Sequence, residues 1–96
     1  MSPKNKIKLK LLRKKLDKLD YQLLKVIKKR TEIIKKVLYL KSYKKEIVDK
    51  KRITSILKKI KKDSMKRNID PKITQRIWKN MIWAYIDFEK RNFKKK

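Results

Sequence analysis

Apolar residues recur at alternating intervals of three and four over residues 9–40, and this pattern leaves the chain few possible folds. The series, called the apolar seam below, consists of Leu9, Leu12, Leu16, Leu19, Leu23, Val26, Ile33, Val37 and Leu40. It predicts one long helix from about Lys6 to Lys41. At about 1.5 Å per residue this helix is on the order of 50 Å long, whereas a compact chain of this size is roughly 30 Å across. A single copy does not cover such a helix, so we predict an intertwined helical homodimer.

A second helix is predicted after a connector at residues 42–48. Asp49 is a suitable capping residue, because its carboxylate can accept a hydrogen bond from a backbone N–H of the first helical turn. The helix is expected to end near Lys66 and to carry its apolar residues on one side. These residues are Ile53, Ile56, Leu57 and Ile60.

A third helix is predicted from Asp70 to about Asn92. Asp70 is followed by Pro71, whose fixed φ suits the first helical position, so the pair is a strong start signal. The apolar stripe of this helix contains Ile73, Ile77, Trp78, Met81, Ile82, Tyr85 and Ile86. The next position at helical spacing is Glu89, so a carboxyl group is predicted on a face that should be buried.

The three helices account for nearly the whole chain. Glycine is absent, and no stretch shows the turn-punctuated alternation that strands require. We therefore predict a single all-α domain over residues 1–96, with a core from about residue 11 to 93 and flexible Lys-rich ends.

The missing residue types limit the chemistry of the chain. Without Cys, His or Gly, it has no thiolate, no imidazole base, no ordinary zinc site and no glycine-rich phosphate loop. Catalysis by Lys, Arg and carboxylates remains, and we expect neither a cofactor nor a metal.

The formal net charge of +25 at pH 7 raises the alternative of a basic helical module that binds nucleic acid or an anionic membrane. The lysines are spread over the chain together with many Ile residues, which is typical of an AT-rich genome. We therefore interpret most of this charge as a solvated surface and expect neither a nucleic-acid nor a membrane partner. Because no apolar run reaches the length of a signal segment or a membrane span, we expect a cytoplasmic location.

Arg30 fills the gap in the apolar seam and should need an anion there. Arg30 and Lys41 are eleven residues apart, so they point within about 20° of each other and about 16 Å apart along the helix. A small dianion between the two side chains would suit that arrangement. The alternative for Arg30 is an ion pair with a neighbouring helix, or a side chain that extends out of the seam to solvent.

Arg13 lies about 25 Å from Arg30 along the same helix and is rotated from it by roughly 100°. It therefore does not serve the same pocket within one chain, but in an antiparallel dimer it could serve the pocket of the partner. The alternative is simple surface solvation.

The segment LRKKLDKLDYQLLKVIKKRTEIIKKVLYLK, residues 12–41, contains Arg13, Asp20, Arg30 and Lys41 at spacings that resemble the first helix of the all-α chorismate mutase family. The resemblance extends from about Leu11 to Phe93. It implies the predicted homodimer and the isomerisation of chorismate to prephenate in aromatic amino-acid biosynthesis.

The resemblance continues in VDKKR, where Asp49 and Arg52 match an Asp-x-x-Arg pattern of the family. It implies that Arg30, Lys41 and Arg52 bind the carboxylates and the ether oxygen of the substrate, and that Arg13 comes from the other subunit. Both Asp49 and Arg52 are thereby assigned to the substrate site.

Two positions of the third helix depart from the commonest bacterial pattern of the family. Glu89 stands where many relatives carry Gln, and a carboxyl group must be protonated to donate a hydrogen bond to the ether oxygen. Tyr85 replaces a small hydroxyl residue, and WAYIDFEKRNF is similar to the isochorismate pyruvate lyase branch of the same fold. That lyase, which forms salicylate, is the alternative activity; ordinary helix packing is the alternative role of Tyr85.

Overall fold

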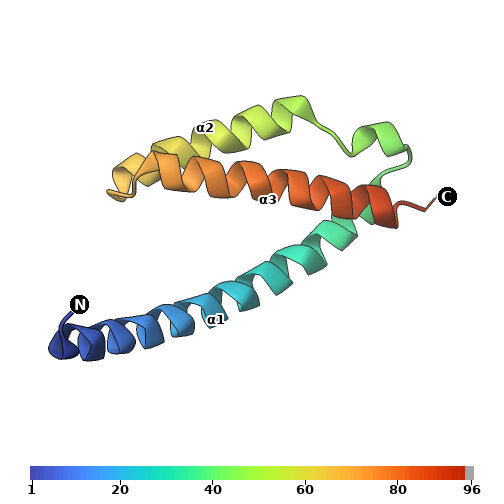
Figure 1. Ribbon diagram of the computed structural model, residues 1–96. Coiled ribbons are helices and arrows are strands. Elements are labelled where there is room, and N and C mark those ends of the chain that lie inside the picture. The colour runs from blue at the N-terminus through green and yellow to red at the C-terminus, as the bar shows by residue number, and fades with distance from the viewer. Residues whose placement is uncertain (95–96) are drawn as a thin grey trace. The chain divides into compact units, whose positions relative to one another are not determined.

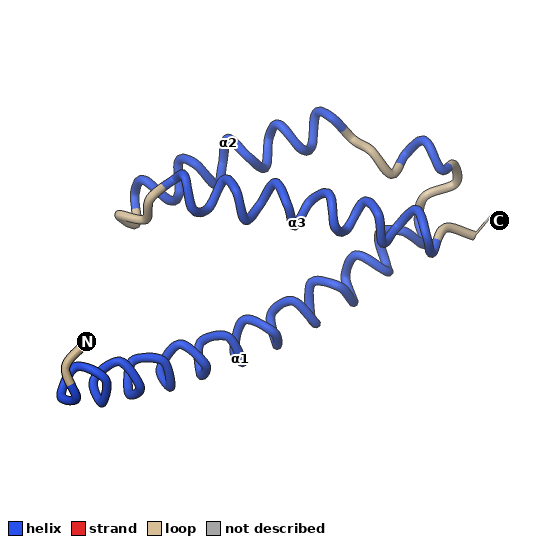
Figure 2. Tube along the Cα trace, viewed as in Figure 1, coloured by secondary structure: helices blue, strands red, loops and turns tan. Residues whose placement is uncertain are grey.

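The computed structural model describes residues 1–94, which form three α-helices and one short 3-10 helix (Figure 1). The elements in chain order are α1 (Pro3–Leu40), η1 (Lys44–Glu46), α2 (Lys50–Lys66) and α3 (Pro71–Asn92). Within residues 1–94 there is no strand, and Figure 2 shows only helices joined by loops. The predicted all-α fold with three main helices is confirmed.

The predicted helix ends agree closely with the structure, except that α1 begins at Pro3 rather than at about Lys6. Pro3 occupies the first helical position, where its missing N–H costs nothing. Ser2 precedes it, and its Oγ accepts a hydrogen bond from the backbone N–H of Asn5 at 3.2 Å. These local signals carry the helix into the Lys-rich start; Lys95 and Lys96 of the opposite Lys-rich end lie outside the described residues.

The chain divides into two compact units, Met1–Ile33 and a second unit that begins at Ile34. The first unit is formed by the N-terminal part of α1, and none of its residues is buried. Most seam residues of this part are exposed, and Leu12, Leu16, Leu19 and Leu23 each expose more than half of their surface, whereas Leu9 is half-buried. This part of α1 is thus helical without a covering layer of its own.

The second unit has a small apolar core. Leu38, in the last turn of α1, is buried together with Ile47 of the connector and Ile86 of α3. Four partly buried apolar residues pack against them: Val48, Ile53, Ile82 and Phe93. The connector therefore contributes directly to the core, although the sequence pattern indicated only a link between helices.

Helices α2 and α3 pack side by side in this unit (Figure 1). The turn between them follows a helix-ending pattern in which Ile69 N–H donates to the carbonyl of Ser64 at 2.9 Å. Asn68 has φ 56°, a left-handed conformation that Asn tolerates better than most residues. The Asp70 carboxylate then accepts from Lys72 N–H at 2.9 Å and caps α3.

Polar side chains also join the two helices. The hydroxyls of Ser64 and Thr74 lie 2.7 Å apart, and the Gln75 side-chain amide donates to the carbonyl of Leu57 at 2.9 Å. Ser64 is buried and its Oγ also hydrogen-bonds the Ile60 carbonyl at 2.6 Å. These contacts hold α2 and α3 in one register.

Candidate active site

The second unit contains one ion pair that is largely shielded from solvent. The Lys41 ammonium donates to Glu89 Oε1 at 2.8 Å, and the two side chains are only 19% and 7% exposed. Burying a charge is costly unless it is paired and hydrogen-bonded, and each member of this pair supplies the other with its counter-charge. The pair is therefore a fixed electrostatic feature and not a surface contact.

The position of Glu89 follows from the spacing of α3. Ile82, Ile86, Glu89 and Phe93 recur at helical intervals, and the three apolar members belong to the core of this unit. The carboxyl group consequently lies on the buried face. The sequence-based prediction that a carboxyl group would be buried on the third helix is confirmed.

Lys41 is brought to Glu89 by the end of α1. The helix ends at Leu40, and the backbone N–H of Lys41 still donates to the carbonyl of Leu38 at 3.1 Å. The connector that follows is held by Glu46, whose carboxylate accepts from Ser42 N–H at 2.8 Å and from Tyr43 N–H at 3.2 Å. Lys41 thus begins a locally constrained segment.

Asp49 and Arg52 lie at the start of α2. The Asp49 carboxylate accepts from the backbone N–H of Arg52 at 3.0 Å, which confirms the predicted helix cap. The guanidinium of Arg52 belongs to an exposed residue. The observed task of Asp49 is therefore to stabilise the first turn of the helix that carries Arg52.

The three remaining predicted site residues are Arg13, Arg30 and Tyr85. Arg13 and Arg30 are exposed residues of α1 in the unit Met1–Ile33. Tyr85 is half-buried on α3, four residues before Glu89 and hence about one turn away. A direct side-chain contact joins Lys41 and Glu89, two of the seven predicted residues.

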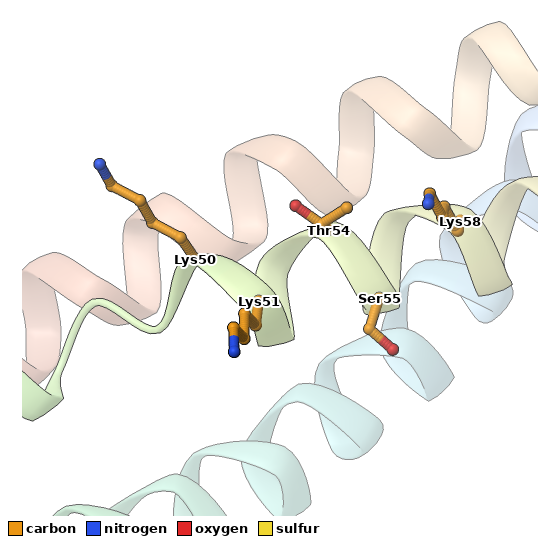
Figure 3. A pocket seen from close by; sticks show the side chains of 5 residues that line it. All are labelled: Lys50, Lys51, Thr54, Ser55 and Lys58. Atoms are coloured by element: carbon orange, nitrogen blue, oxygen red, sulfur yellow. The ribbon is translucent and has the colours of Figure 1, made fainter.

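Two surface hollows on the second unit are open to solvent. One lies over the connector and the start of α2 and is lined by Glu46, Val48, Asp49, Lys50 and Lys51. Another lies on α2 and is lined by Lys50, Lys51, Thr54, Ser55 and Lys58 (Figure 3). Neither is lined by Lys41 or Glu89, so the ion pair is not at the floor of these hollows.

Sequence reasoning did not single out Ser64 or Glu46. Ser64 is a buried hydroxyl that bonds across to Thr74, and Glu46 organises the connector next to Lys41. The residues next to Ser64 in the sequence do not indicate that its hydroxyl contacts Thr74. Within residues 1–94, no group of three or more acidic, His or Cys side chains could hold a metal ion, and no helix has the length and apolarity needed to cross a membrane.

The family comparison agrees with this architecture. The sequence profile of chorismate mutase type II matches residues 12–90, which is most of the chain. The chain therefore belongs to the chorismate mutase type II family. Searches of curated proteins and of solved structures gave no significant match.

Proposed function

We propose that this protein is a chorismate mutase that converts chorismate to prephenate for aromatic amino-acid biosynthesis, and that it acts as a homodimer without a cofactor. The observation that carries the proposal is the buried Lys41–Glu89 pair, 2.8 Å between Nζ and Oε1, in a chain that belongs to the chorismate mutase type II family. The reaction is an intramolecular pericyclic shift, so it requires no nucleophile and no general base. It requires a restricted substrate conformation and positive charge where negative charge develops.

Lys41 is suited to stabilise developing charge on the ether oxygen of the substrate. Its ammonium group has three N–H donors, and the contact with Glu89 occupies one of them. The remaining donors are available to an anionic ligand. Because the side chain is mostly buried, its interaction with a developing charge is screened less than it would be in water.

Glu89 would donate a hydrogen bond to the same ether oxygen, and only its protonated form can do so. Ionised Glu89 attracts Lys41, whereas protonated Glu89 leaves Lys41 with its full charge for the substrate.

A second protomer would complete the site. The exposed leucines of α1 support this part of the proposal, since burying one Leu side chain contributes roughly 1.5–3 kcal/mol and the seam contains several. We infer that Arg30 and Arg52 bind the substrate carboxylates and that Arg13 is contributed by the other protomer. Asp49 would position Arg52 through the first turn of α2, where its carboxylate contacts the Arg52 backbone.

The direct test is a turnover assay with the purified full-length chain and chorismate. The proposal predicts loss of chorismate absorbance with stoichiometric formation of prephenate. Assays with isochorismate run in parallel, and salicylate and pyruvate are measured as products. Much faster turnover of isochorismate than of chorismate would overturn the mutase assignment in favour of the lyase.

The isochorismate pyruvate lyase is the second candidate because of Tyr85. This half-buried tyrosine lies about one turn before Glu89 on α3. Its ring would narrow a site next to the ion pair, and its hydroxyl would add a polar contact for a related dicarboxylate. Tyr85→Ser should then shift the ratio of mutase to lyase turnover towards the mutase, whereas a packing role of Tyr85 leaves that ratio unchanged.

A further inference from the structure

Helix α2 has two chemically different sides. Its inner side carries Ile53, Ile56, Leu57 and Ile60, which are partly buried in the second unit. The cationic residues of the helix are Lys50, Lys51, Arg52, Lys58, Lys59, Lys61, Lys62 and Lys66. Asp63 is the single acidic residue of α2.

Three of the lysines form a narrow line on the outer side, called the lysine strip below. At about 100° per residue, Lys51, Lys58 and Lys62 point within roughly 40° of one another and face away from the apolar side. The successive steps along the axis are about 10 Å and 6 Å. All three residues are exposed, and Asp63 points about 100° away from the strip.

A shallow groove adjoins this strip. Two hydroxyl groups, of Thr54 and Ser55, line it together with three lysines, as Figure 3 shows. Lysine ammonium groups and Ser or Thr hydroxyls are the donors that proteins commonly present to phosphate oxygens. Neither a carboxylate nor an apolar side chain is among the groove residues.

Contrary to the sequence-based expectation of no nucleic-acid partner, we propose that the lysine strip and its adjoining groove bind the phosphate backbone of duplex nucleic acid without sequence preference, an activity separate from the proposed isomerase. The lysine strip together with the two hydroxyls of its groove carries this inference, not the lysine excess of the whole chain. An interfacial membrane helix presents large apolar or aromatic residues beside its lysines, and a single-strand site presents stacking aromatics; neither type lines this surface. Phosphate contacts alone carry no base-specific information.

The test measures binding of the full-length chain to a labelled random-sequence DNA duplex by fluorescence anisotropy over a range of salt concentrations. Two triple variants that remove the same charge are compared. K51Q/K58Q/K62Q removes the strip, and K10Q/K14Q/K18Q removes three exposed lysines from one side of α1, opposite the apolar seam. Circular dichroism confirms that both variants remain helical.

The strip variant should bind at least about tenfold more weakly than the parent, and the slope of log K against log salt should become shallower by about 2 to 3. The α1 variant should lose no more than about threefold in affinity for the duplex.

Equal losses of affinity in both variants would overturn the proposal, because they would mean that total charge governs binding. Binding to phosphatidylserine vesicles that is tighter than binding to the duplex would overturn the proposal in favour of a membrane partner. Competition by polyglutamate as strong as that by unlabelled duplex would overturn it in favour of an acidic protein. Chorismate turnover by the strip variant should match that of the parent, and its loss would contradict the separation of the two activities.

Discussion

The N-terminal part of α1 and the α2–α3 region use the same helical spacing of apolar residues, but only the second buries some of them in a core. Leu19 and Leu23 of α1 are 59% and 56% exposed, whereas Ile86 of α3 is 6% exposed. The second unit brings three segments together around Ile86, and the first has a single helix. Apolar periodicity thus predicts where a helix forms, but covering its apolar side needs another element. In the first unit that element would be a second protomer.

The strongest test of this difference removes apolar surface from the seam. Leu19→Gln with Leu23→Gln should dissociate the proposed dimer, because each lost leucine removes about 1.5–3 kcal/mol of burial per protomer. Sedimentation should then show monomers with reduced helix content. Lys14→Gln with Lys18→Gln, on the opposite side of α1, serves as the control and should stay dimeric. A parent chain that sediments as a monomer would refute the proposal that a second protomer covers the apolar seam.

The proposed cations in the two units should be equally necessary for catalysis. Arg30→Ala and Lys41→Ala should each lower kcat/KM by about a hundred- to a thousandfold, because each removes charge stabilisation from the proposed site. Lys36→Ala, an exposed change on α1, should stay within about twofold of the parent. Since Lys41→Ala leaves Glu89 without its counter-charge, helix content is checked for each variant. Full activity of Arg30→Ala would favour a basic binding module over an enzyme.

In the second unit, the loss of stability from a substitution should depend on whether the residue belongs to the core. Ile86→Ala should lower the free energy of unfolding by about 2–5 kcal/mol, because it opens a cavity between Leu38, Ile47 and α3. Chemical denaturation at several protein concentrations measures this loss. Ile77→Ala, at an exposed position of the same helix, is the control and should cost less in the absence of a partner. Equal losses for the two variants would mean that Ile77 is also covered in the assembled protein.

The pH dependence of catalysis sharpens the role of the ion pair. A carboxyl group at position 89 donates a hydrogen bond only in its protonated form, whereas the amide of Glu89→Gln donates at every pH. The kcat/KM of Glu89→Gln should therefore depend less on pH than that of the parent chain. The same slope in parent and variant would exclude Glu89 as the proton carrier.

The smallest effect is expected at a helix cap. Asp70→Ala should lower the free energy of unfolding by about 1 kcal/mol, because the Lys72 N–H loses its acceptor at the start of α3. Asp70→Asn should retain most of the stability, since an amide oxygen can also accept that hydrogen bond. Thermal unfolding of the two variants measures the difference, and equal losses would contradict a capping role.

Several features of the site could be predicted and others could not. The helical register placed Glu89 on a buried face, and the capping pattern identified Asp49 and Asp70. The burial of Ile47 was not predicted, because residues 42–48 show no periodicity that would mark a core residue. Whether Arg13, Arg30 and Arg52 share one pocket stays a prediction, since it depends on a second protomer.

The sequence by itself determined where α2 and α3 begin and end, where α1 ends, and which side of each helix is apolar. Propensity, capping and side-chain periodicity act between residues only a few positions apart, so they can be read along the chain. Only the tertiary structure decided that the buried carboxyl of Glu89 meets Lys41, forty-eight positions away, and that Ser64 meets Thr74. Those pairings depend on how the chain folds back on itself, which brings together groups that have no local signal for each other.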